Sequence, residues 1–480
     1  MNSLARYNTP AYRSIAAFAI IALVFFWMAY YSVSPVAPNA LPVHHDDYSN
    51  YSLGARAFEW SWIRPLSTGL IYLLSSMGPD YLIWTVRLFT IVYVFFAWKI
   101  LSEVLNIRQY LPSVALFAVA ALSTPIIAEY ARYTGMITHT MSGCLGLAAA
   151  YLLFVDSRKQ GYRYLYLSAI LLILSALAKE DFILFYAFTL AYVLIKSDKA
   201  IARRAVVGGG ALVAALVAVA GAKFIAASSF LGETNAQSPY FIDTSPTGVT
   251  KTVVHYLMGA SHPAMLHHGY VILAAFVIAA LGILLIGVRD RSLPRAIYPI
   301  GAGLAIMAPY SVLPNHVNAY YEIIWTPFIL GGAFIALLEL SKRTSAARQG
   351  AIGLATLAIL AVVLYSTDTP GRKSVAAWYD NVAAANRQSF DLLANHKTAI
   401  NASPVTCIAG ASPFSPWYMH GGNYLSYVLD LRTVWHVSMD PASPYYPGMQ
   451  QGAAASNGTV VIEPDAPSAD CLTITLGANS

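Results

Sequence analysis

Charged residues are scarce in this 480-residue chain, since Asp, Glu, Lys and Arg together make up 11% of the sequence. Soluble domains contain roughly 25% charged residues, so this composition excludes an ordinary soluble protein. Hydrophobic residues account for 57% of the chain, and the mean hydropathy is +0.56. The sequence therefore predicts an integral membrane protein.

Long hydrophilic insertions are also lacking on the side that we predict to be cytoplasmic, where no segment exceeds about fifteen residues. A nucleotide-binding domain of ordinary size has no room to fold there, which disfavours a nucleotide-fuelled mechanism. The net charge of +6 requires no nucleic-acid partner, because inner-loop cations facing anionic membrane lipids account for it. The first apolar run lacks a small-residue cleavage motif, so we expect a retained helix rather than a signal peptide.

Cysteine is rare, with three residues in the chain. Cys144 falls in an apolar run, whereas Cys407 and Cys471 fall in the more polar C-terminal region. An oxidising compartment would favour a disulfide between Cys407 and Cys471, and two unpaired thiols are the alternative. The histidines between 255 and 268 match no strong metal-ligand spacing, so we expect no metal site.

Apolar runs long enough to cross a hydrocarbon core of about 30 Å recur along the chain. We count about eleven such spans and predict a polytopic α-helical membrane protein. The runs cover residues 13–33, 81–101, 111–127, 138–155, 164–178, 182–195, 205–228, 269–287, 296–313, 320–340 and 350–366.

The distribution of cations predicts the orientation, because loops rich in Lys and Arg stay in the cytoplasm. With the N-terminus inside, every second connection is basic, and more than half of the 29 Lys and Arg residues face the cytoplasm. The C-terminal region is then extracytoplasmic. The Ala-rich composition with small loops favours a bacterial inner membrane, with this region in the periplasm.

This topology divides the chain into a transmembrane domain, residues 1–366, and an extracytoplasmic C-terminal domain, residues 367–480. The first outer loop, 34–80, carries amphipathic sequence and aromatic residues that predict helices in the membrane interface. The second large outer loop covers 228–269. The C-terminal domain contains strand-like runs at 459–462 and 471–476, so we expect a small α/β fold.

An acidic pair, Asp46 and Asp47, comes directly after His45 in the loop that follows the first predicted span. This position lies close to the lipid headgroups, where a carboxylate can act as a general base and accept a proton from a hydroxyl group. A solvated loop pair or a helix cap is the alternative interpretation. We predict that Asp46 and Asp47 are catalytic and that His45 is a further polar residue of the site.

Several cations fall on the side of the membrane that we predict to be outside, although more than half of the Lys and Arg residues lie in the predicted inner loops. Guanidinium groups bind phosphate oxygens in bidentate fashion, and lysine adds a point charge, so convergence of these cations predicts a pocket for an anionic headgroup. A single arginine at this depth often only snorkels or pairs with an acid. The candidate phosphate ligands are Arg64, Arg87, Arg132 and Lys179.

Three ionisable residues, Lys179, Glu180 and Asp181, interrupt an apolar hairpin between 165 and 193. They are either a charged turn at the interface or part of the site, and we include Glu180 and Asp181 among its polar residues. The last short outer loop holds further candidates for contact with sugar or phosphate, although tyrosine is also common at membrane interfaces. These are His316, Tyr320 and Tyr321.

The order of these features resembles the GT-C class of membrane glycosyltransferases, in particular protein O-mannosyltransferases, lipid A aminoarabinose transferases and bacterial O-antigen glucosylating enzymes. The resemblance covers roughly the first two thirds of the chain, and its elements are short. They are Asp46-Asp47, Arg64-Pro65-Leu66, Val86-Arg87-Leu88, the turn from Thr124-Pro125 to Arg132, and Leu177-Ala178-Lys179-Glu180.

The resemblance implies an inverting glycosyltransferase that passes a sugar from a polyprenyl-phosphate carrier to a glycan, lipid or protein acceptor on the outer face. Asp46 would deprotonate the acceptor, with Asp47 as its partner or alternate. Relatives often have Glu at the second position, which leaves open which carboxylate is the base. The cations would stabilise the leaving phosphate, so no divalent metal or other cofactor is expected.

Two other classes of function remain open. A flippase or transporter of lipid-linked sugars would share the many spans, but should carry charge near the membrane midplane and inverted repeats. A polymerase or ligase of envelope glycans would share the phosphate pocket, but favours a long outer loop between late spans. The late loops of this chain are short.

Overall fold

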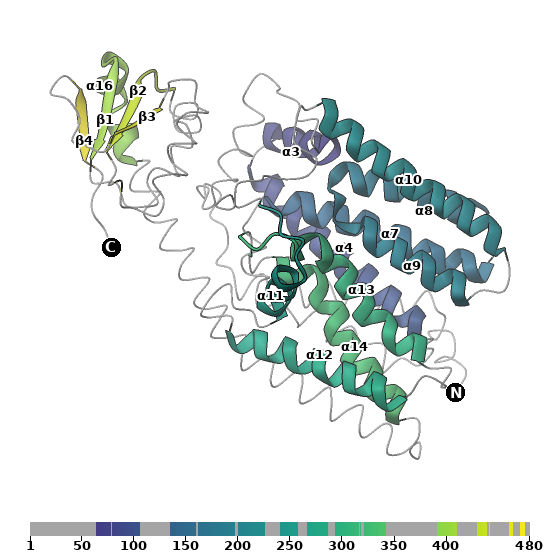
Figure 1. Cartoon of the computed structure of the whole chain (residues 1–480). Helices are drawn as coiled ribbons and strands as arrows, with labels where there is room; N and C mark the ends of the chain where they lie inside the picture. The colour runs from purple at the N-terminus through teal and green to yellow at the C-terminus, as the bar shows by residue number, and fades with distance from the viewer. Residues whose placement is uncertain are drawn as a thin grey trace, which may run out of the picture.

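The computed structural model describes residues 64–77, 79–105, 135–159, 162–196, 200–225, 241–257, 266–286, 293–315, 317, 321–341, 391–409, 430–438, 441, 460–463 and 471–475. Most of them form helices, and a small sheet lies in the C-terminal region (Figure 1). The helices are α3 (Pro65–Met77), α4 (Pro79–Leu105), α7 (Met136–Lys159), α8 (Tyr162–Ala178), η2 (Glu180–Phe182), α9 (Ile183–Lys196), α10 (Ile201–Ile225), α11 (Pro246–Leu257), α12 (Leu266–Ile286), α13 (Leu293–Ser311), α14 (Glu322–Ser341) and α16 (Lys397–Ala402).

Three of the described helices are long and apolar enough to cross a membrane. These segments are Tyr81–Val104 of α4, Met136–Arg158 of α7 and Ile201–Ile225 of α10. Shorter apolar helices accompany them in α8, α12 and α14. Eight of the predicted apolar runs coincide with the helices α4, α7 to α10 and α12 to α14. The runs predicted at 13–33, 111–127 and 350–366 lie outside the described residues.

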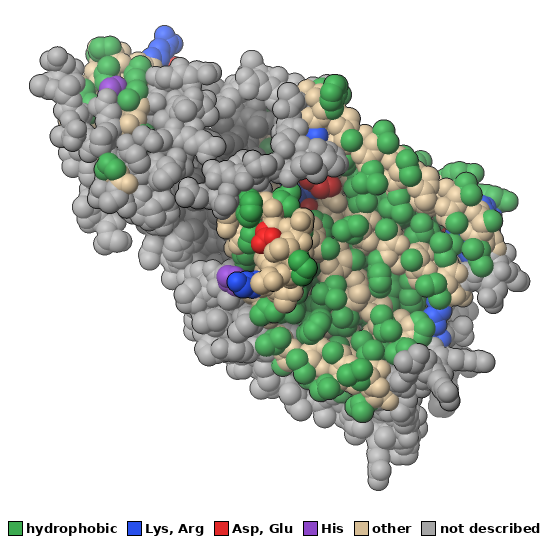
Figure 2. Space-filling view, viewed as in Figure 1, with side chains coloured by type: hydrophobic (Ala, Val, Ile, Leu, Met, Phe, Trp, Pro, Cys, Tyr) green, Lys and Arg blue, Asp and Glu red, His purple; other side chains and the backbone are tan. Residues whose placement is uncertain are grey.

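The long helices pack into one helical body (Figure 1). Helix α7 contacts α4, α8 and α9, while α14 contacts α12, α13 and α4. Large apolar side chains remain exposed on the outer surface of this body, including Val206, Val217 and Phe224 on α10. Figure 2 shows hydrophobic side chains covering most of the visible helical face. Such a surface is compatible with lipid rather than water as its solvent.

The end of the helical body where α7 stops contains a buried ion pair. The carboxylate of Asp156 accepts hydrogen bonds from Nε of Arg204 at 2.7 Å and from Nη2 of Arg203 at 3.3 Å. Asp156 and Arg204 are fully buried. Nearby, Arg158 forms a more exposed bridge of 2.8 Å to Glu103 on α4. These pairs link α7 to α10 through a contact that solvent does not reach and to α4 through a more exposed one.

The C-terminal region contains a four-stranded sheet with the order β3-β2-β1-β4, in which all neighbouring strands are parallel. Trp435, Ile408 and Val437 are buried in its core. The runs predicted at 459–462 and 471–476 correspond to β3 and β4. The strands are β1 (Val405–Ala409), β2 (Val434–Ser438), β3 (Val460–Glu463) and β4 (Leu472–Thr475).

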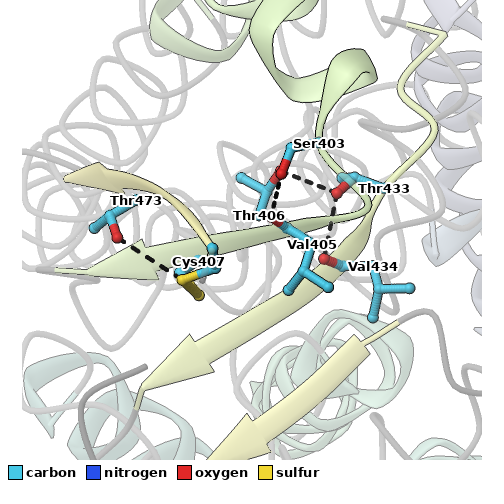
Figure 3. The surroundings of a disulfide bond; sticks show 8 residues. Ser403, Val405, Thr406, Cys407, Thr433, Val434 and Thr473 are labelled. Atoms are coloured by element: carbon cyan, nitrogen blue, oxygen red, sulfur yellow. Dashed lines mark hydrogen bonds between the residues drawn. A yellow bond between two sulfur atoms is a disulfide. The ribbon is translucent and has the colours of Figure 1, made fainter. Parts of the chain in front are cut away.

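A disulfide joins the middle of β1 to the start of β4 (Figure 3). The bond links Cys407 to Cys471, whose Cα atoms lie 5.8 Å apart, and the sulfur of Cys471 lies 3.8 Å from the hydroxyl of Thr473. The remaining cysteine, Cys144, is a buried free thiol on α7. The structure thus pairs the two cysteines for which the sequence left a disulfide and free thiols as alternatives.

Thiol counting tests this pairing. Protein unfolded without reductant is expected to expose one reactive thiol, Cys144, and protein unfolded after reduction is expected to expose all three. Mass spectrometry after alkylation gives the count and locates it. Labelling of Cys407 and Cys471 without reductant would contradict the disulfide.

The buried ion pair predicts a large loss of stability in the Asp156→Ala variant. The substitution leaves the buried Arg204 guanidinium without the carboxylate that accepts from its Nε. Removing one partner of a buried pair costs about 3–5 kcal/mol. Thermal unfolding in detergent measures the effect. The matched control is Glu103→Ala, which removes a more exposed bridge worth roughly 0–1 kcal/mol. Equal losses in the two variants would refute the assignment.

Candidate functional site

The turn between α8 and α9 brings charged residues into the helical body. Helix α8 ends at Ala178, and Lys179 is extended, with φ −169° and ψ 146°. The carbonyl of Lys179 accepts a hydrogen bond of 2.6 Å from the hydroxyl of Ser142 on α7, and its amide donates to the backbone carbonyl of Ser175 at 2.9 Å. The hydroxyl of Ser142 therefore satisfies the carbonyl of Lys179 where the helix is interrupted, and the amide of Lys179 still bonds within the last turn of α8.

A glycine on α7 allows η2 to settle against that helix. A Cβ atom at Gly146 would lie 2.5 Å from the Cβ of Phe182, the residue that ends η2. Phe182 is fully buried and packs edge to face on Tyr93 of α4, with ring centroids 6.0 Å apart. The hydroxyl of Tyr93 donates to the carbonyl of Ile324 on α14. Close approach at Gly146 thus fixes the turn among three helices.

Four side chains, His139, Lys179, Asp181 and Tyr310, form a hydrogen-bonded group that we name the buried cluster. Nδ1 of His139 donates to Oδ2 of Asp181 at 2.8 Å, and Nζ of Lys179 donates to Nε2 of His139 at 2.7 Å. Because a carboxylate only accepts and an ammonium only donates, these contacts place the imidazole proton on Nδ1. The hydroxyl of Tyr310 lies 2.9 Å from the same nitrogen and hydrogen-bonds to Asp181.

Aromatic rings enclose the ammonium group of Lys179. It lies 5.6 Å from the ring centroids of both Tyr310 and Tyr321, a distance suited to cation–π attraction. Tyr310 and Tyr321 stack with centroids 4.3 Å apart, and Tyr310 also contacts the fully buried Trp325. The buried cluster contains residues of α7, the turn and α13. Aromatic residues at and near the start of α14 pack against it.

Charge pairing keeps Asp181 ionised despite its burial. Burial by itself raises the pKa of this carboxyl, but Lys179 and His139 outweigh that effect and hold the pKa below its usual range. The ammonium of Lys179 lies 3.8 Å from Oδ2. The side chains of Lys179 and Asp181 are 9% and 3% exposed, so both charges depend on each other rather than on solvent.

A second layer, composed of Arg64, Glu180 and Lys223, lies beside the buried cluster and is named the outer triad. Nζ of Lys223, in the last turn of α10, is 3.2 Å from Oε1 of Glu180. Burial by itself raises the pKa of Glu180. The positive charges of Arg64, Lys223 and Lys179 outweigh this effect and hold the pKa below its ordinary value. Helix α3 is held here by Ser67, whose hydroxyl donates to the carbonyl of Ala178 at 3.0 Å.

The structure brings together five of the residues that the sequence singled out. Arg64, Lys179, Glu180, Asp181 and Tyr321 all belong to, or contact, the buried cluster and the outer triad.

Arg87 has a different described neighbour. Its guanidinium lies over the ring of Trp84, 4.9 Å from the centroid, on α4. Six other predicted site residues lie outside the described residues: His45, Asp46, Asp47, Arg132, His316 and Tyr320.

Three residues of the site, His139, Tyr310 and Lys223, were missed by sequence reasoning. Two of them carry a signal, because His139 and Lys223 are ionisable residues inside apolar runs, where they are expensive. Tyr310 carries none, since tyrosine is common in this chain. Within the described part of the chain, no group of three or more His, Cys, Asp and Glu residues is placed to hold a metal ion.

A comparison with protein-family models finds no match for this chain, and a comparison with curated proteins also finds none.

The close contact at Gly146 predicts a destabilised Gly146→Ala variant. The added methyl group overlaps the Cβ of Phe182 and pushes η2 away from α7, and overpacking of this kind costs about 1–3 kcal/mol. The control is Gly209→Ala on α10, where a Cβ meets nothing within 4 Å. Thermal unfolding of both variants is the measurement. A Gly146→Ala variant as stable as the control would refute the packing argument.

Proposed function

We propose that this protein is an inverting membrane glycosyltransferase of the GT-C type. It moves a sugar from a polyprenyl-phosphate donor to a glycan, lipid or protein acceptor at the outer face of a bacterial inner membrane. The residues of the described site would serve the donor phosphate, while the acidic pair of the first outer loop would serve the acceptor.

One observation supports this proposal above the others: Arg64, Lys179 and Glu180 converge at one end of an apolar helical body. Charge in such surroundings is expensive and is usually retained for chemistry. The cations match the charge that develops on a phosphate as its bond to a sugar breaks, and preorganised opposite charge is an effective way to lower that barrier.

In the proposed reaction the acceptor oxygen attacks the anomeric carbon of the donor sugar. The bond between that carbon and the phosphate oxygen breaks, and the phosphate keeps the electron pair. The carboxylate of Asp46, with Asp47 as partner or alternate, takes the acceptor proton. Arg64, Arg87, Arg132 and Lys179 stabilise the departing phosphate, with His316, Tyr320 and Tyr321 near the sugar or phosphate. This scheme uses no metal ion or other cofactor.

The contacts of Lys179 refine its part in this scheme. Its ammonium is engaged by His139 and Asp181 inside the buried cluster. In this scheme Lys179 acts on the phosphate through its charge at short range, and direct contact with the phosphate is assigned to Arg64.

A transporter of lipid-linked sugars is the second candidate, because a buried group of His, Asp and Lys is the kind of unit that relays protons in transporters. The position of the charges argues against it. No Asp, Glu, Lys or Arg occurs in α7 between 140 and 155 or in α10 between 205 and 222. Charge is thus gathered near the helix ends, which suits chemistry at one leaflet better than passage across the midplane.

Transfer assays with purified protein and a synthetic polyprenyl-phosphate sugar test the proposal. We expect Asp46→Asn or Asp47→Asn to lower the rate of transfer by about 10²-fold or more, because one of them removes the general base. Arg64→Ala should lower it by a similar factor through loss of phosphate stabilisation.

The control is Arg158→Ala, which lies at the opposite end of α7 and should leave transfer unchanged. Full activity in both Asn variants would overturn the catalytic assignment. If wild-type protein transferred no sugar but moved a labelled lipid-linked sugar between leaflets of a vesicle, the transporter would replace the transferase.

A further inference from the structure

Helices α9 and α13 run antiparallel, and their side chains pair in a regular order that leads away from the charged turn. The ring of Phe188 fits against Gly301, where a Cβ atom would overlap it. The hydroxyls of Thr189 and Tyr298 lie 2.8 Å apart, and the rings of Tyr192 and Tyr298 have centroids 4.5 Å apart. Each turn forward along α9 is thus matched by a turn back along α13.

The next pair in this order consists of two cations, Lys196 and Arg295. Lys196 is the last residue of α9, four residues after Tyr192, and Arg295 lies in the first turn of α13, three residues before Tyr298. Residues three or four apart lie on the same face of a helix. An electrostatic interaction between Lys196 and Arg295 agrees with this placement. Two neighbouring helices therefore bring like charges together.

Repulsion between these two cations is visible in the ionisation of Lys196. Burial lowers the pKa of Lys196, and the positive charge of Arg295 lowers it further. A carboxylate in contact with Lys196 would act in the opposite direction. Among the acids whose side chains the structure describes at this end, Asp156 binds the two arginines of α10, and Glu103 binds Arg158. An anion supplied from outside the chain would relieve the repulsion.

Exposed apolar side chains lie beside both cations in the sequence. Ile195, directly before Lys196, is 79% exposed, and Ile297, two residues after Arg295, is 41% exposed. Acyl chains of a lipid can cover such side chains, whereas a soluble anion can cover only the charges. The combination of two cations and adjoining apolar surface matches a molecule that has an anionic headgroup and acyl chains.

We propose that Lys196 and Arg295 form a binding site for an anionic phospholipid, in the leaflet that the sequence predicts to be cytoplasmic. The lipid phosphate accepts charge-assisted hydrogen bonds from the ammonium and guanidinium groups. Helix α9 has 14 residues, so this site lies roughly 21 Å along the helix from the charged turn. The bound lipid joins α9, which directly follows the turn, to α13, which carries Tyr310.

Native mass spectrometry of the full chain tests the site with phosphatidylglycerol, and phosphatidylcholine with the same acyl chains is the zwitterionic comparison. We expect phosphatidylglycerol to bind more tightly. Lys196→Gln and Arg295→Gln should each weaken its binding about fivefold, the contribution of one basic residue near anionic lipid. The matched control is Arg163→Gln, which removes an exposed cation near the start of α8 and should leave the affinity unchanged.

A charge reversal provides a second test, with thermal unfolding in nanodiscs as its measurement. Lys196→Glu places a carboxylate beside Arg295, where it takes the place of the lipid phosphate. We expect phosphatidylglycerol, added to phosphatidylcholine nanodiscs, to raise the unfolding temperature of the wild type and of the control Arg163→Glu, but not that of Lys196→Glu. An equal rise in all three proteins would overturn the inference.

Three results of the binding experiment would also overturn it: equal affinity of the wild type for the two lipids, unchanged affinity in both Gln variants of the site, or an equal loss in Arg163→Gln. Inorganic phosphate that displaces phosphatidylglycerol at the same concentration as the lipid would overturn the assignment to a lipid. None of these measurements involves sugar transfer, so they test the lipid site separately from the proposed transferase.

Discussion

The contact between Lys179, His139 and Asp181 is the interaction on which the described helical body depends most. Three ionisable groups share an environment that excludes solvent, and each satisfies the next through a hydrogen bond. An unpaired charge at this depth would cost several kcal/mol. The break between α8 and α9, the position of η2 and the approach of α7 are all compatible with this one hydrogen-bonded arrangement.

Small residues make that arrangement possible. Gly146 admits Phe182 at a distance that any larger residue would prevent. The hydroxyl of Ser142 donates to the carbonyl of Lys179 at the interruption, and the hydroxyl of Ser175 donates to the carbonyl of Ser142 on α7. In a bundle of apolar helices, small residues let backbones approach and short polar side chains hold them together. The same helix, α7, uses a different device at its other end, where Asp156 binds two arginines of α10. Its two ends are thus fixed by charge, and its middle is fixed by packing.

The two layers at the site differ in how far solvent reaches them. The buried cluster is enclosed by Tyr310 and Tyr321 and has its charges paired internally, so it is suited to holding the turn in place. In the outer triad, the side chains of Glu180 and Lys223 are more exposed than those of Lys179 and Asp181. In the proposed transferase, a solvent-excluded group behind a more accessible one would keep the geometry of the site while ligands exchange.

Much of the helical architecture follows from sequence, because an apolar run must satisfy its backbone within itself when lipid surrounds it. The runs at 164–178 and 182–195, with a charged turn between them, match α8, η2 and α9 closely. In the C-terminal region, the predicted strand-like runs match β3 and β4, whereas β1 and β2 were not predicted. The parallel order β3-β2-β1-β4 was not predicted either, since pairing joins segments that lie far apart in the chain.

Sequence by itself determined which segments are helices and that Lys179, Glu180 and Asp181 are unusual, because hydrophobic periodicity and charge are local properties. Tertiary structure alone decided that Asp181 points to His139, 42 residues away, and that Glu180 meets Lys223, 43 residues away. It also separated Lys179 and Glu180, adjacent in the chain, into a buried layer and an accessible one. Partners of this kind are selected by helix packing, which depends on how all the side chains of the bundle fit together at once.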